Sequence, residues 1–350
     1  METARRIKDV LADRSFIFRA GAWKPRTSPN TFQGVGEEAL SWLQEVKASY
    51  GIDVATEVAT PEHVKLALEA GMDYLWIGAR TSANPIALQE ISKAIGDRLR
   101  LTEHRPASPD KTQTELPLKG ILIKNPVNAD SGLWLGNIER LEKTGVPVIA
   151  VHRGCNHQPC WGMAHAVRKV RPDIPMLLDP SHLSGEAAKV PALLSKVDEL
   201  GLDGAMIEVH YRPEEALSDA KQQIRPAELT ENLSPKRVLR PSTGRSIERS
   251  SSLLKRGSQD TELNWLRAEI DELDESLWTT IAARMDVSKR IGEWKKEHGV
   301  APLQPQRYQE ILNKLTIKNE ELKKDGIVLS EEFMKNVWEL IHEESLRQQI

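Results

Sequence analysis

Short apolar runs alternate with helical patterns between residues 15 and 226 of this chain. Seven such runs, each bounded by glycine, proline or polar residues, are SFIFRAG (15–21), IDVATEV (52–58), YLWIGA (74–79), GILIKN (120–125), VPVIAVHR (146–153), PMLLDP (175–180) and GAMIEVH (204–210). Helix-like segments such as EEALSWLQEVKAS (37–49) lie between them. Nearly continuous apolar strands that alternate with helices predict a parallel sheet covered by crossover helices.

Polar and charged side chains gather where these predicted strands end. They are Arg19, Lys24, Glu57, Arg80, Lys124, Arg153, His182 and Glu208. In a (β/α)8 barrel the active site is built at the carboxyl ends of the strands. The pattern therefore predicts an α/β fold of the TIM (β/α)8 type, of which seven strands are recognisable. The chain opens in a helix, so either the first strand is missing from this chain or its role is supplied in another way.

The character of the sequence changes after residue 228. Residues 229–259 are rich in serine, arginine and lysine without an apolar period, which predicts a flexible, exposed linker. Residues 260–350 predict an all-α domain of three helices, the second over about 305–323 and the third capped by Ser330. We therefore expect a barrel domain at 1–228 and a three-helix domain at 260–350 that forms a bundle and dimerises.

Composition argues against several classes of function. A formal net charge of -3 disfavours a nucleic-acid surface, which needs a concentrated basic field. No stretch approaches about 18 consecutive apolar residues, and the first residues lack the apolar core of a signal peptide, so no membrane span is expected. Two cysteines, Cys155 and Cys160, are too few for a disulfide framework, which favours a cytoplasmic location.

Three segments near the C-terminal end carry a specific pattern, namely LRAEIDELDESL (266–277), AARMDVSKRIGEWKKEHGV (282–300) and IHEESLRQQ (341–349). In order and spacing they resemble the all-helical class of chorismate mutase across 260–350. The resemblance implies the Claisen rearrangement of chorismate to prephenate, without a cofactor. It also implies a set of catalytic residues, which are Arg267, Arg284, Lys295, Gln304, Arg307, Ser345 and Gln349. Gln304 and Tyr308 stand where carboxylates often contact the substrate hydroxyl.

Helical geometry supports part of this set. Arg284 and Lys295 are eleven residues apart and return to within about 20° of the same face, and Ser345 and Gln349 also share a face. Arg267 lies roughly 25 Å before Arg284 along a straight helix and about 100° round it, so an antiparallel partner chain would have to deliver it. The spacing therefore predicts a homodimer. For any single residue of the set, the alternative is a solvated helix charge.

The barrel half carries a second pattern, in RAGAWKPRTSP (19–29), IGARTS (77–82), LIKN (122–125), DPSH (179–182) and IEVHYRPEEALSD (207–219). Over roughly residues 1–226 it resembles the type I 3-deoxy-D-arabino-heptulosonate-7-phosphate (DAHP) synthases, and most closely the β subtype that is often fused to a mutase. The resemblance implies a metal-dependent condensation of phosphoenolpyruvate (PEP) with erythrose 4-phosphate.

The same resemblance implies substrate contacts in the barrel. Phosphoenolpyruvate is a small trianion, and its pocket needs several fixed cations. Arg19, Lys24 and Lys124 would face the carboxylate, and Lys24 is also expected to be catalytic. Arg80 and Arg153 would hold its phosphate, and Arg26 and Thr27 would bind the phosphate of the aldose. Octulosonate 8-phosphate synthases have an alanine-asparagine pair in this motif, so KPRT favours the four-carbon sugar.

The implied metal ligands are His182, Glu208 and Asp219, with Glu57 near the metal or a water. Imidazole with carboxylates suits Mn2+ best, and Fe2+, Zn2+ or Co2+ are alternatives. The family's fourth ligand is a cysteine in a Gly-Pro-Cys segment, which this sequence does not contain. Cys155 and Cys160, near His157, are either a replacement or incidental thiols.

Two readings follow from the two patterns. In the first, one chain catalyses two reactions of aromatic amino-acid biosynthesis, the condensation in the barrel and the rearrangement in the helices. The mutase half would also sense a product such as prephenate and transmit inhibition to the barrel. In the alternative, only the mutase is active, and the truncated barrel is inactive or is a regulatory binding module. The expected partners are small-molecule substrates and a second copy of the chain.

Overall fold

The computed structural model describes most of the chain. The described residues are 1–12, 14–25, 30–103, 118–156, 158–229, 251–324 and 326–349.

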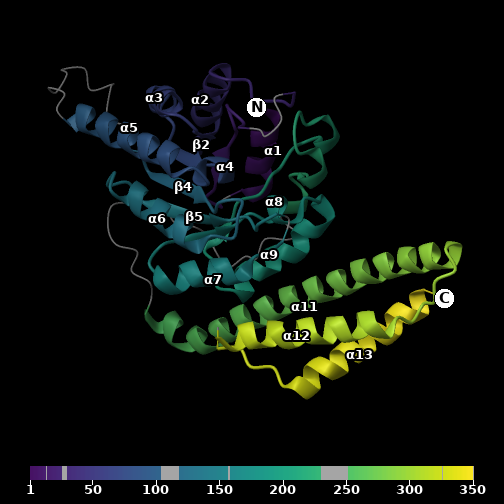
Figure 1. Ribbon diagram of the computed structural model, residues 1–350. Coiled ribbons are helices and arrows are strands. Elements are labelled where there is room, and N and C mark those ends of the chain that lie inside the picture. The colour runs from purple at the N-terminus through teal and green to yellow at the C-terminus, as the bar shows by residue number, and fades with distance from the viewer. Residues whose placement is uncertain are drawn as a thin grey trace, which may run out of the picture. The chain divides into compact units, whose positions relative to one another are not determined.

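Seven parallel strands form one sheet in which each strand pairs with its neighbours in sequence (Figure 1). They are β1 (Ile17–Arg19), β2 (Asp53–Glu57), β3 (Tyr74–Ile77), β4 (Gly120–Lys124), β5 (Val148–His152), β6 (Met176–Leu178) and β7 (Gly204–Ala205). The seven predicted strands are therefore confirmed. Within the described ranges β1 and β7 are the two edges, and the sheet is a curled half-barrel.

Helices connect the strands and cover the outside of the sheet. They are α1 (Glu2–Leu11), α2 (Glu38–Tyr50), α3 (Pro61–Glu69), α4 (Ala79–Ser82), α5 (Pro85–Glu103), α6 (Ser131–Glu142), α7 (Trp161–Val170), α8 (Pro180–Ser184) and α9 (Val190–Glu199), with short 3-10 turns η1 (Ala187–Lys189), η2 (Pro213–Glu215) and η3 (Ala220–Gln222). The local sequence explains where several of these helices begin. Thr60 caps α3, which has Pro61 in its first turn, and Asp130 caps α6 through the Leu133 amide.

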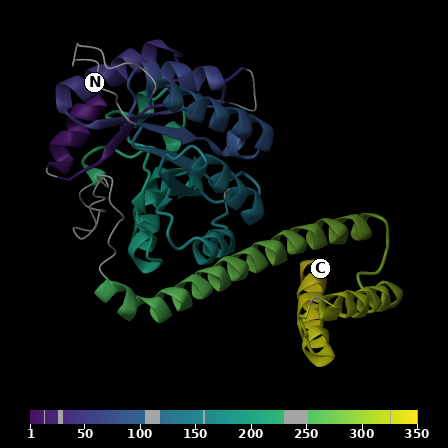
Figure 2. The ribbon, with the colours of Figure 1, turned by 90° about the vertical axis from the view of Figure 1, so that its left-hand side faces the viewer.

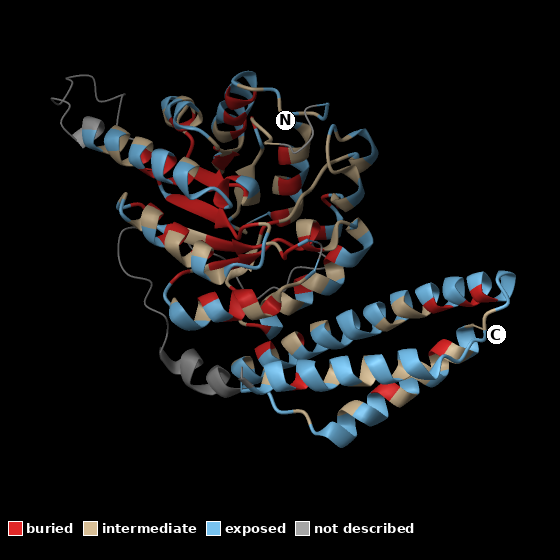
Figure 3. Ribbon diagram, viewed as in Figure 1, coloured by how far each residue is buried: buried red, intermediate tan, exposed pale blue. Residues whose placement is uncertain are grey.

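The strands separate two layers of side chains with a period of two. Leu75 and Ile77 of β3 face the helices and join the main core, whereas Tyr74 and Trp76 face the inside of the half-barrel. Buried residues are accordingly concentrated on the strands and on the helix faces against them (Figure 3). The same alternation continues to the strand ends, so it decides which polar side chains enter the interior.

Three helices follow the half-barrel: α11 (Ser251–Glu297), α12 (Pro305–Lys324) and α13 (Glu331–Gln348). The predicted capping of α13 is confirmed, because the Ser330 hydroxyl accepts a hydrogen bond of 3.1 Å from the Phe333 amide. α11 begins at Ser251, inside the stretch 229–259 that the sequence predicts to be a linker, and that linker stays a prediction. Leucine, lysine and arginine at the start of α11 favour helix. Figure 2 shows α12 and α13 crossing each other.

The chain divides by contacts into one compact unit at Met1–Glu269 and a second at Ile270–Ile350. The first unit includes the early part of α11, because Trp265 packs on α7 and is only 2% exposed. Its ring lies 6.1 Å from Trp161 and stacks at 5.5 Å on His165. The His165 imidazole also bonds to Glu262 at 2.9 Å and to Glu269 at 2.6 Å. The functional boundaries 1–228 and 260–350 stay predictions.

No helix in the described ranges combines the length and apolarity that a membrane span needs.

Replacing Trp265 by alanine tests how firmly this stretch of α11 belongs to the first unit. We expect the Trp265→Ala chain to lose about 3 kcal/mol or more of unfolding free energy, because a large buried ring is removed and leaves a cavity. Urea unfolding followed by circular dichroism measures the loss. Trp42→Ala is the control, since Trp42 is 46% exposed and its removal should change much less. Equal effects of the two substitutions would contradict the packing described above.

Candidate functional site

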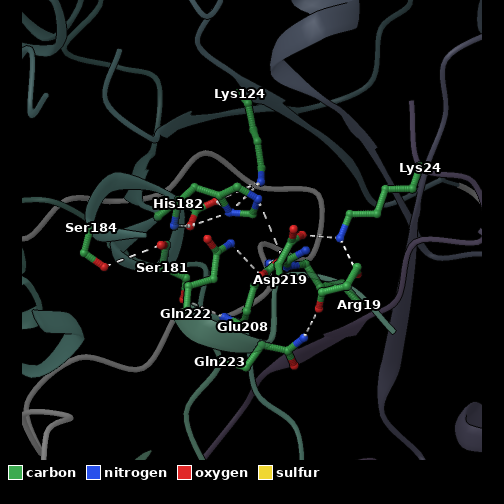
Figure 4. A network of polar contacts seen from close by, with 12 residues as sticks. Arg19, Lys24, Lys124, Ser181, His182, Ser184, Glu208, Asp219, Gln222 and Gln223 are labelled. Carbon is green, nitrogen blue, oxygen red and sulfur yellow. Dashed lines mark hydrogen bonds and ion pairs between the residues drawn. The ribbon is translucent and has the colours of Figure 1, made fainter. Parts of the chain in front are cut away.

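The polar side chains at the carboxyl end of the half-barrel point inward because of the strand period. Arg19 follows Ile17, Glu57 follows Ala55 and Lys124 follows Leu122, each two residues further along the same inner face. The first members of these pairs belong to the inner apolar cluster, and the second members stand above it. Figure 4 shows Arg19, Lys24, Lys124, His182, Glu208 and Asp219 converging from different segments.

Three of these side chains form a candidate metal centre. One ligand atom from each of His182, Glu208 and Asp219 lies within 4.8 Å of the others. The His182 Nε2 to Glu208 Oε1 distance is 3.7 Å. One imidazole with two carboxylates is a donor set that suits a divalent transition metal, so the residues present fit such an ion.

A buried carboxylate orients the histidine of this group. Asp179 is fully buried and caps α8, accepting a 3.0 Å hydrogen bond from the His182 amide. Its side chain also lies 3.0 Å from His182 Nδ1 and 2.8 Å from Lys124 Nζ. Burial alone would raise the pKa of the Asp179 carboxyl, but His182 and Lys124 hold that pKa well below its ordinary value. The Nδ1 contact leaves His182 Nε2 directed toward Glu208.

Arg19 and Glu208 face each other beside this group. Their ion pair is 3.6 Å long, and the Arg19 guanidinium lies 5.1 Å over the Trp76 ring. Among the described residues, Arg19 Nε and Nη2 are buried without a hydrogen-bond partner. Buried guanidinium donors without acceptors are costly, and an anionic ligand would satisfy them. Burial raises the pKa of Glu208, but His182 and Arg19 outweigh it and the pKa is lowered.

Lys24 reaches the same centre from the loop after β1. Its Nζ forms an ion pair with Asp219 and donates a 2.6 Å hydrogen bond to Ser218. Glu208 accepts a 2.8 Å hydrogen bond from Gln222, which follows Asp219 closely in the chain. Asp219 is thus held by the opposite charge of Lys24, and Glu208 by the side-chain amide of Gln222.

The remaining predicted barrel residues are placed as follows. Burial raises the pKa of the Glu57 carboxyl. A Cβ at Gly78 would overlap its Oε1, so a larger residue there would displace the Glu57 side chain. Arg80 is exposed and donates to the Pro25 carbonyl at 3.3 Å. Arg153 is half-buried, and its amide donates to Asn125 Oδ1 at 2.7 Å. Arg26 and Thr27 lie outside the described residues.

The half-barrel contains a cavity of about 1100 Å3. Arg19, Lys24, Lys124, His182 and Glu208 line it together with inner-face residues such as Trp76. Cations and carboxylates at one end of an apolar cavity match the usual form of a small-molecule site.

In the second unit, four predicted residues meet between α11 and α13. Arg284 donates to the Ser345 hydroxyl, and Lys295 donates to Gln349 at 3.0 Å and to the Pro302 carbonyl at 2.6 Å. Lys295 and Ser345 are buried. Gln304, Arg307 and Arg267 are exposed, and the first two do not join this group; Arg267 belongs to the first unit.

Several residues of these sites were not predicted. Asp179 stands in the quoted DPSH segment, and an acid directly before a proline at a helix start was the available signal. Trp338 and His342 lie at helical spacing before Ser345 and Gln349, and that spacing was the signal for them.

Both halves of the chain match models of known protein families. The model described as DAHP synthetase I family matches residues 1–95 and 121–237, and the model described as chorismate mutase type II matches residues 266–350.

Individual proteins agree with these families. The phospho-2-dehydro-3-deoxyheptonate aldolase of Thermotoga maritima is 31% identical over 224 residues, which are 64% of this chain and 60% of the aldolase. A crystal structure of a Thermotoga maritima protein with that name superposes with a TM-score of 0.52 at 28% identity, over 66% of this chain and 62% of the other. A 4-amino-4-deoxychorismate mutase of Streptomyces venezuelae is 44% identical over 50 residues, covering 14% of this chain and 48% of that protein.

The lowered pKa of Asp179 predicts a stability that depends on pH. The native carboxyl stays ionised below its ordinary pKa of 3.8, where the unfolded chain binds the proton, so the unfolding free energy falls as the pH drops below about 4. Asp179→Asn should flatten this dependence and should cost about 3 kcal/mol at pH 7, because Lys124 keeps a buried, unpaired charge. Urea midpoints between about pH 3 and 7 measure both effects.

The matched control for this measurement is Asp97→Asn, since Asp97 is exposed and, within the described part of the chain, forms an ion pair with Arg100 of its own helix. It should leave the pH dependence unchanged. Parallel pH curves for Asp179→Asn and the unsubstituted chain would show that the buried carboxylate has no such role.

Proposed function

We propose that this chain, which belongs to the DAHP synthetase I family and carries a chorismate mutase type II region, catalyses two reactions of aromatic amino-acid biosynthesis. The first is the condensation of phosphoenolpyruvate with erythrose 4-phosphate to DAHP, and the second is the rearrangement of chorismate to prephenate. The chain matches 60% of the length of the Thermotoga aldolase, and the activity is therefore proposed from the site. The observation that supports the condensation reaction is that Arg19, Lys24 and Lys124 lie close to His182, Glu208 and Asp219.

In the barrel, the charges of the side chains match the charges of phosphoenolpyruvate. Arg19, Lys24 and Lys124 bind its carboxylate. The two Arg19 donors that are buried without a hydrogen-bond partner among the described residues support this assignment. Arg80 and Arg153 bind its phosphate, and Arg26 and Thr27 bind the phosphate of the aldose. Lys24, which pairs with Asp219 of the proposed metal centre, is the residue we propose to act beside the reacting carbon atoms.

His182, Glu208 and Asp219 hold a divalent metal, which we propose to be Mn2+, with Fe2+, Zn2+ or Co2+ as alternatives. Bound there, the ion would polarise the aldehyde of the sugar as a Lewis acid. Asp179 keeps His182 in the tautomer whose Nε2 is free to bind. Glu57 lies at the same strand ends, close enough to Lys124 and Arg19 for their charges to act on it.

In the second unit, the chemistry needs only binding and electrostatics. Arg284 binds a carboxylate of chorismate, and Lys295 and Gln349 donate to the ether oxygen. Ser345, Gln304 and Arg307 complete the hydroxyl and carboxylate contacts, and Arg267 comes from a second copy of the chain. The buried Lys295, held by Gln349 and Pro302, supports this assignment because its ammonium is already desolvated and fixed in position.

A second candidate function keeps only the mutase active, with the barrel inactive or a regulatory module that binds phosphoenolpyruvate. The observation that favours it is that the described sheet has seven strands, and no Gly-Pro-Cys segment stands in the sequence. The name of the Streptomyces relative also makes 4-amino-4-deoxychorismate a competing substrate for the mutase unit. We keep the prediction of a cytoplasmic location, which rests on the two cysteines.

Two assays on the whole chain test the proposal. One follows the loss of phosphoenolpyruvate in the presence of erythrose 4-phosphate with and without Mn2+, and the other follows the loss of chorismate. His182→Ala should abolish the first activity and leave the second, because it removes a metal ligand. Lys295→Met should lower chorismate turnover by about 100-fold or more and leave the first activity, because it removes the donor to the ether oxygen.

Lys296→Met is the control for Lys295→Met, since Lys296 is the exposed neighbour on the same helix. Chorismate turnover without consumption of phosphoenolpyruvate would establish the second candidate function. A folded chain that consumes neither substrate would refute both.

We also propose a homodimer through α11. Ile270, Leu273 and Leu277 are 57%, 67% and 54% exposed, at a spacing of three and four residues that forms one apolar stripe. An antiparallel second copy would cover this stripe and would bring its own Arg267 to the mutase site.

Leu273→Glu should convert the dimer to a monomer, because it places a charge in the apolar stripe, and should also lower mutase activity by separating Arg267 from the partner site. Sedimentation equilibrium with a parallel chorismate assay measures both. Lys289→Glu is the control, since Lys289 is exposed and lies about 160° round the helix from Leu273. A monomer of undiminished mutase activity in the unsubstituted chain would rule the dimer out.

A further inference from the structure

Trp76 is a buried side chain of β3 to which the proposed reactions assign no role. It is 3% exposed and belongs to the inner apolar cluster of the half-barrel. Its register partners are Glu57 of β2 and Leu122 of β4, so it lies at the level where the polar site begins. A large ring at this level can contact the side chains that we propose to bind substrate.

The indole of Trp76 extends across β2 to the end of β1. In register, Ala55 of β2 lies between Arg19 of β1 and Tyr74 of β3. The small side chain of Ala55 leaves space beside it for a large ring from the next strand. The Arg19 guanidinium carbon lies 5.1 Å from the centre of the Trp76 ring, and a Cβ at Gly21 would lie 3.7 Å from Trp76 Cζ2. Trp76 therefore supports Arg19 from two strands away.

Arg19 needs such support because of its place in the sheet. Within the described ranges β1 is an edge strand, so Arg19 has a neighbouring strand on one side only. Its Nη2 lies 3.6 Å from Glu208 Oε1, which is too far for a hydrogen bond. Among the described residues its Nε and Nη2 have no hydrogen-bond partner, and these adjacent donors form the fork that can bind both oxygens of a carboxylate. Contact with the face of a ring uses neither donor, so both stay available to a ligand.

We propose that Trp76 is a positioning residue of the barrel site, which holds the Arg19 guanidinium where it binds the carboxylate of phosphoenolpyruvate. The inference rests on the proposed condensation and deepens it. An aromatic ring suits this task better than an aliphatic side chain, because its face attracts a cation in addition to packing against it. The same contact limits the movement of a long side chain on an edge strand, so less freedom is lost when the ligand binds.

A double-mutant cycle on the dissociation constant (Kd) of phosphoenolpyruvate tests this role. Calorimetric titration of the whole chain in the presence of Mn2+ measures Kd. Trp76→Leu should raise it by about 10-fold, and Trp76→Phe by about 3-fold, because phenylalanine keeps a ring face. Arg19→Ala should raise it by about 100-fold, because both donors of the fork are lost. In the Arg19→Ala chain neither substitution of Trp76 should raise Kd further, since Trp76 acts through Arg19.

The condensation assay gives a second measurement of the same role. Trp76→Leu should raise KM for phosphoenolpyruvate by about 10-fold and leave kcat and KM for erythrose 4-phosphate unchanged, because the carboxylate contact is made equally before and during the reaction. Trp76→Phe should restore most of the lost affinity. A loss of kcat alone would contradict a positioning role.

Tyr74→Leu is the matched control. Tyr74 is buried on the same face of β3, two residues before Trp76, and packs on Gly120 of β4, on the side away from β1. It should leave Kd unchanged, although it also removes a large inner ring. Circular dichroism shows which variants are folded, and Trp76→Phe completes the cycle if the leucine variant is not.

The outcomes separate the inference from the proposed function. If the unsubstituted chain binds phosphoenolpyruvate and the substitutions of Trp76 have no effect, or an equal effect with and without Arg19, the inference is wrong while the binding site stands. An equal loss in Tyr74→Leu would likewise reduce Trp76 to general packing. If the unsubstituted chain does not bind phosphoenolpyruvate, the proposed condensation and the inference fail together.

Discussion

The burial of the Asp179 carboxylate is the constraint on which the barrel site depends. A buried charge of this kind is stable only if cations and hydrogen-bond donors surround it. Lys124 from β4 and the backbone and ring of His182 from α8 meet this need. The same contacts hold the His182 ring beside Glu208. One electrostatic requirement therefore holds two segments together and also orients the imidazole that we propose as a metal ligand.

The strand period extends this order to the rest of the site. Parallel strands end at one edge, and alternate side chains of each strand face the interior. Arg19, Glu57 and Lys124 therefore meet without any special local conformation. The sequence predicts this convergence, because apolar runs between glycine and proline mark the strands and polar residues mark their ends. It does not reveal Asp179 as the centre of the network, since burial of one carboxylate depends on how the segments pack.

The three-helix half was predictable in a different way. Spacing on single helices placed Arg284 with Lys295 and Ser345 with Gln349, and the structure brings both pairs together. Contacts between helices do not follow from spacing alone. The approach of Tyr308 to His342 depends on how α12 crosses α13. The burial of Trp265 was missed for a similar reason, since its place on an apolar helix gave no hint that its partners would be Trp161 and His165 of α7.

The packing of Trp265 has a consequence for how the chain can be divided. Residues 260–269 are part of the compact unit that contains the half-barrel, yet the mutase pattern begins at residue 266 and includes Arg267. A gene split anywhere upstream of this stretch would strip a tryptophan from the barrel surface, and a split downstream of it would take an arginine from the mutase. Residues 266–269 therefore belong both to the compact unit of the half-barrel and to the region that matches the mutase family, so the chain cannot be cut into two separate proteins without taking residues from one of them.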